Sequence, residues 1–179
     1  MQRIIIFLLL LLLFHPTYGQ TDGKSLAIEG LNYYNGRTVT QNYQLAADYF
    51  RRSAALGDMV GEYYLGLCYY NGNGLARNYS EAFKWYSKSA KQGCAQAICE
   101  LGYCYYMGHG VTSDSHKAFE MYEISASKGY PKAQFFLGDC YFNGEGVEAD
   151  ETKARYWYHK AAEQGNEEAK EALIRLLEE

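Results

Sequence analysis

The residues of this chain whose types and spacing could support covalent catalysis lie in the segment Ser125-Ala126-Ser127-Lys128. In one class of serine enzymes, a Ser-x-x-Lys element supplies a nucleophilic hydroxyl and a lysine, and the class also uses Ser-Asp-Asn and Lys-Thr-Gly elements. Here Ser113-Asp114 is followed by Ser115, and Lys-Thr-Gly does not occur. Lys128 also stands at the expected end of a helix, where a cation stabilises the helix dipole. We therefore expect no catalytic residues and predict that the chain is not an enzyme.

The chain has five cysteines, which are the next reactive group. Cys68, Cys104 and Cys140 follow one another at intervals of 36 residues. Equivalent places in stacked helix pairs lie about 10 Å apart or more, whereas a disulfide needs Cα atoms within about 7 Å. We expect these three cysteines to be small buried apolar residues. An oxidising compartment would allow a disulfide between Cys94 and Cys99, and the sequence leaves that pairing open.

The histidines and one sequon carry weaker signals. His109, His116 and His159 do not share a helical face with a cysteine or carboxylate at the spacing of metal ligands. We therefore expect no metal site and no cofactor. The segment Asn78-Tyr79-Ser80 is a glycosylation sequon, and whether Asn78 carries a glycan depends on the source of the protein.

These residues are positioned by a repeat. The segment that begins at Leu65 reads LGLCYYNGNGL, and it recurs as LGYCYYMGHGV from Leu101 and as LGDCYFNGEGV from Leu137. A more divergent copy begins at Glu29. The second residue of each copy is a glycine, and these glycines are 36 residues apart throughout. A constant period of this length indicates a repeat array.

Each repeat has the pattern of two helices. In the third repeat, apolar residues recur at three- and four-residue steps over 97–108 and at four-residue steps over 118–126, as on one face of a helix. Gly108 and Gly129 follow these stretches, and glycine readily adopts the left-handed conformation that ends a helix. No stretch shows the two-residue alternation typical of a strand.

The predicted fold is therefore all-α: a solenoid of four helix pairs with a C-terminal capping helix. We expect the repeats at residues 23–58, 59–94, 95–130 and 131–166, and the capping helix at 167–179. In the first repeat, Glu29 replaces the leucine and Thr38 replaces the second loop glycine. A first repeat that faces solvent, as terminal repeats do, explains both differences.

The N-terminus has the pattern of a secretory signal peptide. A short positive start, Met1–Arg3, precedes an apolar run of 11 residues, Ile4–Phe14, and a small residue, Gly19, follows a break. An uncleaved anchor is the alternative, but a helix needs roughly 20 apolar residues to span a bilayer. We predict a signal peptide at 1–19, a secreted or periplasmic protein, and no stable membrane insertion after cleavage.

Composition limits the partners. A hydrophobic content of 48% excludes a disordered chain, and the net charge of −4 disfavours non-specific binding to nucleic acid. The 19 tyrosines are mostly explained by the repeat. We therefore expect a protein or peptide partner and no nucleic acid.

The repeat resembles the Sel-one-like repeat family, a relative of the tetratricopeptide repeat. The resemblance rests on L-G-x-x-Y-x-x-G-x-G-V followed by K-A-x-x-W-Y-x-K-A-A-x-Q-G, which is most complete around Lys153-Ala154 and Trp157-Tyr158. It covers about residues 23–179. It implies antiparallel helix pairs stacked into a right-handed α/α superhelix, used mostly as an adaptor in protein assemblies.

The resemblance also implies that the first helix of each pair lines a concave surface. The residues expected to bind a partner there are Tyr34, Tyr63, Leu67, Tyr70, Tyr103, Tyr106, Phe135, Asp139 and Phe142. A concave aromatic patch is usually an interaction site, and tyrosine is frequent in binding hot spots. In the alternative interpretation, the second tyrosine of each Tyr-Tyr pair only packs between repeats.

We predict a non-enzymatic scaffold that binds a peptide or protein segment on this surface. The alternative is a secreted cell-envelope enzyme, because some cysteine-rich members of the family are associated with β-lactam binding or hydrolysis. Those members also staple the two helices of a repeat with paired cysteines. This chain has Ala90, Ala126 and Ala162 where such a pair would need a cysteine.

Overall fold

The computed structural model describes residues 22–178, and these form nine helices and no strand. The helices are α2 (Gly23–Asn35), α3 (Tyr43–Ala55), α4 (Met59–Asn71), α5 (Tyr79–Lys91), α6 (Ala95–Met107), α7 (Ser115–Ser127), α8 (Pro131–Asn143), α9 (Glu151–Glu163) and α10 (Glu167–Glu178). The predicted all-α solenoid is confirmed. The predicted signal peptide, residues 1–19, lies outside the described residues.

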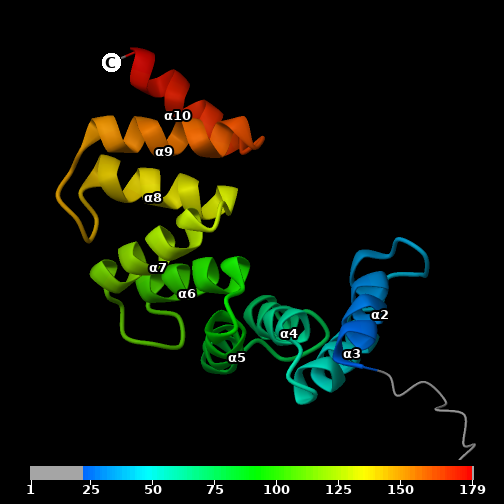
Figure 1. Cartoon of the computed structure of the whole chain (residues 1–179). Coiled ribbons are helices and arrows are strands. Elements are labelled where there is room, and N and C mark those ends of the chain that lie inside the picture. Colours follow the sequence, from blue (N-terminus) through cyan, green and yellow to red (C-terminus); the bar gives the residue numbers. More distant parts are fainter. Residues whose placement is uncertain (1–21, 179) are drawn as a thin grey trace, which may run out of the picture.

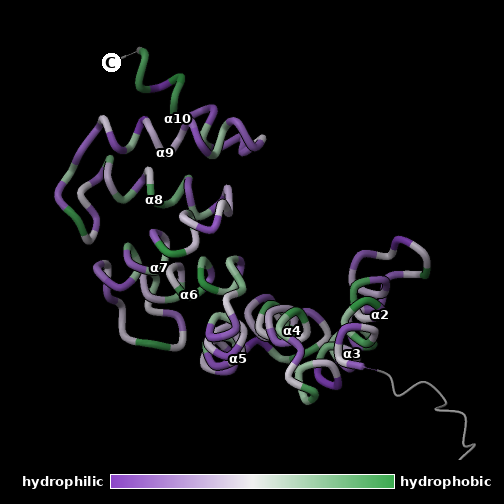
Figure 2. Tube along the Cα trace, in the orientation of Figure 1, coloured by the Kyte–Doolittle hydropathy of each residue, from purple (hydrophilic) through white to green (hydrophobic). Residues whose placement is uncertain are grey.

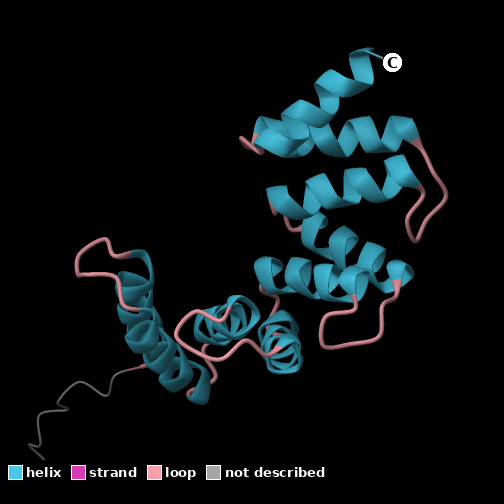
Figure 3. Cartoon of the chain, turned by 180° about the vertical axis from the view of Figure 1, so that it is seen from behind, coloured by secondary structure: helices cyan, strands magenta, loops and turns pink. Residues whose placement is uncertain are grey.

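The helices are arranged as successive pairs in a curved array (Figure 1). Within a pair, the two helices are joined by the longer loops 36–42, 72–78, 108–114 and 144–150, which Figure 3 shows from behind. Successive pairs are joined by three-residue turns. The array forms an open arch, with α2 and α10 at its two ends. Hydrophobic and hydrophilic residues are interspersed along all the helices (Figure 2), as expected when each helix buries one face against its neighbours.

The second helix of each pair begins at a capping side chain. Asn42, Asn78, Asp114 and Asp150 each accept a hydrogen bond from the backbone N–H three residues further on, at 3.0–3.1 Å. Such a cap satisfies one of the N–H groups that have no partner at the start of a helix. Asn78, in the sequon, thus occupies the same capping position as its equivalents in the other three repeats.

The glycine of each Leu-Gly pair lets the two helices of a repeat approach closely. A Cβ atom on Gly102 would lie 2.7 Å from the ring of Tyr122, and a Cβ atom on Gly138 would lie 2.6 Å from the ring of Tyr158. A real side chain cannot fit there without moving the ring. The large ring of the second helix therefore fills the layer beside the glycine.

The second loop glycine is needed where one repeat meets the preceding one. Gly110 has a φ of +75°, and a Cβ atom there would clash with the backbone carbonyl of Tyr79, at the start of α5. Gly146 meets Ser115 at the start of α7 in the same way. Thr38 occupies this place in the first repeat, because no described helix precedes α2 to approach it.

The buried layer agrees with the sequence pattern. All five cysteines are free and buried, and burial raises the pKa of Cys68, Cys104 and Cys140 to about 12. Thiols in such surroundings stay protonated and unreactive. The burial of Cys68, Cys104 and Cys140 confirms the prediction that they are small buried residues. Glu29 is exposed, as expected for a first repeat that faces solvent.

Candidate functional site

Two adjoining pockets lie on the first helices of the C-terminal half of the arch. The larger, which we call the α8–α10 pocket, has a volume of about 350 Å³ and is lined by Phe135, Asp139, Phe142, Asn143, Tyr158, Ala172, Arg175 and Leu176. The smaller, the α6–α8 pocket, has about 110 Å³ and is lined by Tyr103, Tyr106, Tyr122, Phe136, Asp139, Cys140, Asn143 and Glu145. Asp139 and Asn143 line both, so the two pockets meet at the inner face of α8.

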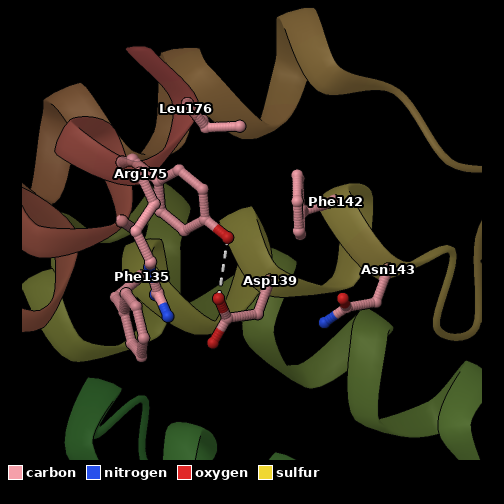
Figure 4. A pocket seen from close by; sticks show the side chains of 8 residues that line it. Phe135, Asp139, Phe142, Asn143, Arg175 and Leu176 are labelled. Atoms are coloured by element: carbon pink, nitrogen blue, oxygen red, sulfur yellow. Dashed lines mark hydrogen bonds between the residues drawn. The ribbon is translucent and has the colours of Figure 1, made fainter. Parts of the chain in front are cut away.

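Asp139 is the polar centre of this surface. Figure 4 shows Phe135 and Phe142 on either side of its carboxylate. The hydroxyl of Tyr158 donates a hydrogen bond to Oδ1 of Asp139 at 2.7 Å. Burial raises the pKa of Asp139 to about 6, although the hydrogen bond from Tyr158 favours the ionised form. Asp139 is therefore a carboxylate at neutral pH that is only partly compensated by its surroundings.

The second tyrosine of the Tyr-Tyr pairs reaches the loop of the next repeat. Three hydrogen bonds join residues 39 apart: Asn73 Nδ2 donates to the hydroxyl of Tyr34 at 3.0 Å, the Tyr70 hydroxyl pairs with His109 Nδ1 at 2.8 Å, and the Tyr106 hydroxyl donates to Glu145 Oε1 at 3.2 Å. The partner in every case is the residue between the two loop glycines. These tyrosines therefore connect neighbouring repeats.

A model of the Sel1 repeat matches four segments of the sequence, residues 26–58, 60–94, 95–130 and 131–166. The chain belongs to the Sel1 repeat family. The resemblance predicted from the sequence is thereby confirmed. Sel1 repeat proteins are typically protein–protein interaction scaffolds and generally have no catalytic role.

Solved structures of other Sel1 repeat proteins share this architecture. The chain is similar to a protective antigen of uropathogenic Escherichia coli with an SLR fold, at 40% identity and a TM-score of 0.76 over 83% of this chain and 32% of that one. It is similar to a Sel1 repeat protein of Oxalobacter formigenes at 33% identity and a TM-score of 0.76, over 84% of this chain and 62% of that one. It is also similar to cysteine rich protein B of Helicobacter pylori at 26% identity and a TM-score of 0.59, over 77% of this chain and 99% of that one.

This Sel1 chain spans about a third of the Escherichia coli protein and about three fifths of the Oxalobacter formigenes protein. A search of curated proteins found no significant match.

Other predicted binding residues of the Sel1 array are partly buried and pack against neighbouring side chains. The ring of Tyr63 lies 4.9 Å from that of Tyr64, centroid to centroid, and burial raises the pKa of Tyr63 above its usual range. Tyr103 stacks on Phe136 at 6.0 Å. Leu67 packs against the buried cluster of the second and third repeats.

Phe135, Asp139 and Phe142 come together in the α8–α10 pocket, while Tyr103, Tyr106 and Asp139 come together in the α6–α8 pocket. Tyr34, Tyr63, Leu67 and Tyr70 lie outside both pockets.

The Ser-x-x-Lys element of this Sel1 chain has a structural role. Ser125 is fully buried, and its hydroxyl donates to the backbone carbonyl of Ala95 at 2.7 Å. The equivalent serines of the first and second repeats, Ser53 and Ser89, donate in the same way to the backbone carbonyls of Gly23 and Met59, at 2.6 and 2.8 Å. We call these three residues the clasp serines, because each ties the second helix of a repeat to the start of the first. Their spacing of 36 residues was visible in the sequence, but their bond was not.

Glu145 and Arg175 are the two charged pocket residues that sequence reasoning missed. Glu145 stands between the two loop glycines of the fourth repeat, at a place taken by Asn73 and His109 in the second and third. That variability at a fixed place was the available signal. Arg175 belongs to α10 and lies 36 residues after Asp139, so extending the period into the capping helix was the available signal.

Among residues 22–178, no group of three or more histidine, cysteine, aspartate or glutamate side chains could hold a metal ion. No described helix is long and apolar enough to cross a membrane.

Proposed function

We propose that this Sel1 repeat chain is a non-enzymatic scaffold that holds a peptide, or a segment of a partner protein, along the inner surface of α6, α8 and α10. The observation that carries the proposal is that two pockets adjoin there and share Asp139 and Asn143. Hollows side by side on neighbouring helices suit an extended segment whose successive side chains enter different pockets.

Exposed aromatic side chains at the rims support this proposal. Tyr106 and Phe142 each keep 41% of their surface exposed, although most aromatic rings of the array are more deeply buried. Phe142 is the fourth-repeat equivalent of the tyrosines that bond to the next loop, and it has no hydroxyl to do so. Rigid rings of this kind supply large contact area at low cost in conformational entropy, which favours them as anchors.

The chemistry of the surface favours binding over catalysis. Ser125 is occupied by the clasp bond, and the Cys140 thiol in the α6–α8 pocket is protonated at neutral pH because burial raises its pKa to about 12. The partner segment would be retained by burial of aromatic surface and by polar contacts with Asp139 and Asn143, without a covalent step.

The predicted signal peptide at residues 1–19 motivates the proposed compartment, which is secreted or periplasmic. Envelope and secreted fractions are therefore the material in which to look for the partner.

A pulldown from these fractions tests the proposal. We expect the wild-type protein to retain a partner that the Tyr106→Ala and Phe142→Ala double variant loses, because both exposed rings are removed from the inner surface. Ile124→Ala is the matched control, since Ile124 is 43% exposed on α7 and lines neither pocket.

Circular dichroism should show equal helical content in all three proteins. Equal capture of the partner by the double variant and the control would contradict the proposed surface, as would hydrolysis of a chromogenic β-lactam that is lost on Ser125→Ala.

A further inference from the structure

The α6–α8 pocket has the lining expected of a site for an organic cation. Its aromatic walls are Tyr103, Tyr106, Tyr122 and Phe136, and its charged groups are the carboxylates of Asp139 and Glu145. No lysine, arginine or histidine lines it. The faces of aromatic rings carry partial negative charge and attract cations, so rings and carboxylates favour the same kind of occupant.

The two carboxylates are available for such an occupant. Asp139 accepts one hydrogen bond from Tyr158 through Oδ1, and Glu145 accepts one from Tyr106 through Oε1. Neither forms an ion pair within residues 22–178. A carboxylate has about four acceptor sites, so each retains acceptor capacity after its single bond to a tyrosine hydroxyl.

The two nearby basic side chains, Lys132 and Arg175, form no ion pair with the carboxylates of this pocket. Lys132 lies over the ring of Phe136 at 5.7 Å, but its amine is held by Glu100 at 2.7 Å. Arg175 lines only the α8–α10 pocket, from which its charge acts on Asp139 without forming an ion pair. The two pockets therefore differ in charge. The larger pocket is lined by one basic and one acidic side chain, Arg175 and Asp139, whereas the charged side chains of the smaller pocket, Asp139 and Glu145, are both acidic.

The size of the pocket limits the occupant to the end of a side chain. Its 110 Å³ gives room for about four water-sized groups, at roughly 30 Å³ each. Whole small-molecule ligands usually need roughly 300 Å³ or more. A guanidinium group has four heavy atoms, is planar, stacks on aromatic rings and donates to two acceptors at once, whereas an ammonium group is compact and strongly hydrated.

We propose that the α6–α8 pocket receives the guanidinium of an arginine in the partner segment, stacked on its aromatic walls and paired with Asp139 and Glu145. This inference rests on the proposed function, because it names the anchor residue of the segment held on the same surface. The neighbouring α8–α10 pocket, with Arg175 in it, receives an uncharged or acidic side chain of the same segment.

The test is an NMR titration of the ¹⁵N-labelled protein with Nα-acetyl-arginine amide. Nα-acetyl-citrulline amide is the matched ligand control, because citrulline has nearly the same shape without the charge. We expect saturable shifts of the Cys140, Asn143 and Glu145 amides with arginine and an affinity about tenfold weaker for citrulline. Equal affinities, or shifts confined to the α8–α10 pocket, would overturn the proposal.

Variants give a second readout. The Asp139→Asn and Glu145→Gln double variant should bind arginine amide about tenfold more weakly. The amide that replaces the Asp139 carboxylate still offers Tyr158 an oxygen acceptor, so the packing is preserved. Glu148→Gln is the matched control, because Glu148 is exposed in the same loop and lines neither pocket. Unchanged affinity in the double variant, with a native spectrum, would sink the assignment.

The titration and the pulldown can fail independently. If the Tyr106→Ala and Phe142→Ala variant loses its partner but arginine amide does not bind, the scaffold function stands and the arginine anchor is wrong. If arginine amide binds in the pocket but no partner depends on the inner surface, the proposed scaffold function is wrong, and with it the assignment of the arginine to a partner.

Discussion

The inner faces of the two halves of the solenoid are built from the same repeat, but they present different surfaces. The place after the helix glycine is Leu31 and Leu67 in the first two repeats, and Tyr103 and Asp139 in the third and fourth. The leucines pack against the buried clusters, while Asp139 lies between two pockets. The same repeated place therefore faces a packed cluster in the N-terminal half and lines pockets in the C-terminal half.

The ring opposite this place shows the same difference. In the second repeat, the hydroxyl of Tyr86 is buried without a hydrogen-bond partner, and its ring lies beside Gly66. In the fourth repeat, the equivalent Tyr158 donates to Asp139 at 2.7 Å. The N-terminal half therefore buries a polar group at a cost to stability, whereas the C-terminal half pairs that group with a carboxylate that faces a pocket.

The comparison depends on the register of the repeats. The substitution with the largest expected effect on the free energy of unfolding tests that register. Leu101 and Glu29 occupy equivalent places in the third and first repeats, but Leu101 is buried between the second and third repeats and Glu29 is exposed. Leu101→Ala should lower the free energy of unfolding by roughly 2–5 kcal/mol. Glu29→Ala should change it by less than about 0.5 kcal/mol. Urea titrations of both variants measure the difference, and equal effects would contradict the register.

The clasp serines distinguish the first three repeats from the fourth, which has Ala161 at that place. Ser125→Ala should lower the free energy of unfolding by roughly 0.5–1.5 kcal/mol, because the hydrogen bond from the buried Ser125 hydroxyl to the Ala95 carbonyl is lost. Ser127 is exposed and bonds only within its own helix, so Ser127→Ala is the control and should cost less than about 0.5 kcal/mol. If the two substitutions had the same effect in thermal unfolding, the clasp would have no role in stability.

The fold could be predicted from the sequence because it depends on period and residue size. The constant spacing of 36 residues and the glycines, large aromatic residues and cysteines that recur at it can be read directly from the sequence, and in a stack of repeats equivalent places pack in equivalent ways. Even the exposed Glu29 follows from the repeat, since the first repeat has no preceding neighbour in the described array.

The site could be predicted only in part, because it depends on how successive repeats stack. The Tyr106 hydroxyl bonds to Glu145, which is 39 residues further on. Whether residues at that separation meet depends on the angle between successive repeats, which the sequence pattern does not give. The stacking of repeats also decides which predicted residues line a pocket. Phe135, Asp139 and Phe142 line the α8–α10 pocket, whereas Tyr34, Tyr63, Leu67 and Tyr70 lie outside both pockets. Identical places in the repeat thus have different surroundings in space.

Tyr86 and Tyr158, the equivalent tyrosines of the second and fourth repeats, give a direct test of the comparison. Tyr158→Phe should lower the free energy of unfolding by roughly 1–2 kcal/mol, because the half-buried Asp139 loses its donor. Tyr86→Phe should leave it unchanged or raise it by up to about 1 kcal/mol, because an unpaired buried hydroxyl is removed. Chemical unfolding measures both. A loss of stability in Tyr86→Phe as large as in Tyr158→Phe would show that the two halves do not differ in this way.

The smallest expected effect is a dependence of stability on pH that Asp139 adds to the C-terminal half. Its pKa is about 6 in the folded chain and about 3.9 in an unfolded one, so between these values the folded state binds more protons. The free energy of unfolding should therefore rise as pH falls from about 7 to about 4 through this group. Two pKa units correspond to at most roughly 3 kcal/mol, and partial exposure to solvent reduces this to roughly 1 kcal/mol.

Asp139→Asn removes the titrating group and keeps an acceptor for Tyr158, so the variant should be more stable than the wild type at pH 7 and equally stable near pH 4. The difference between the two unfolding curves cancels the contributions of carboxylates that do not interact with Asp139, and it includes the coupling of Asp139 to Glu145 and Arg175. A difference that stays constant from pH 7 to pH 4 would mean that burial does not penalise the Asp139 carboxylate. Greater stability of the variant at pH 7, together with weaker arginine binding, would show that the charge at Asp139 costs the fold stability and serves the pocket.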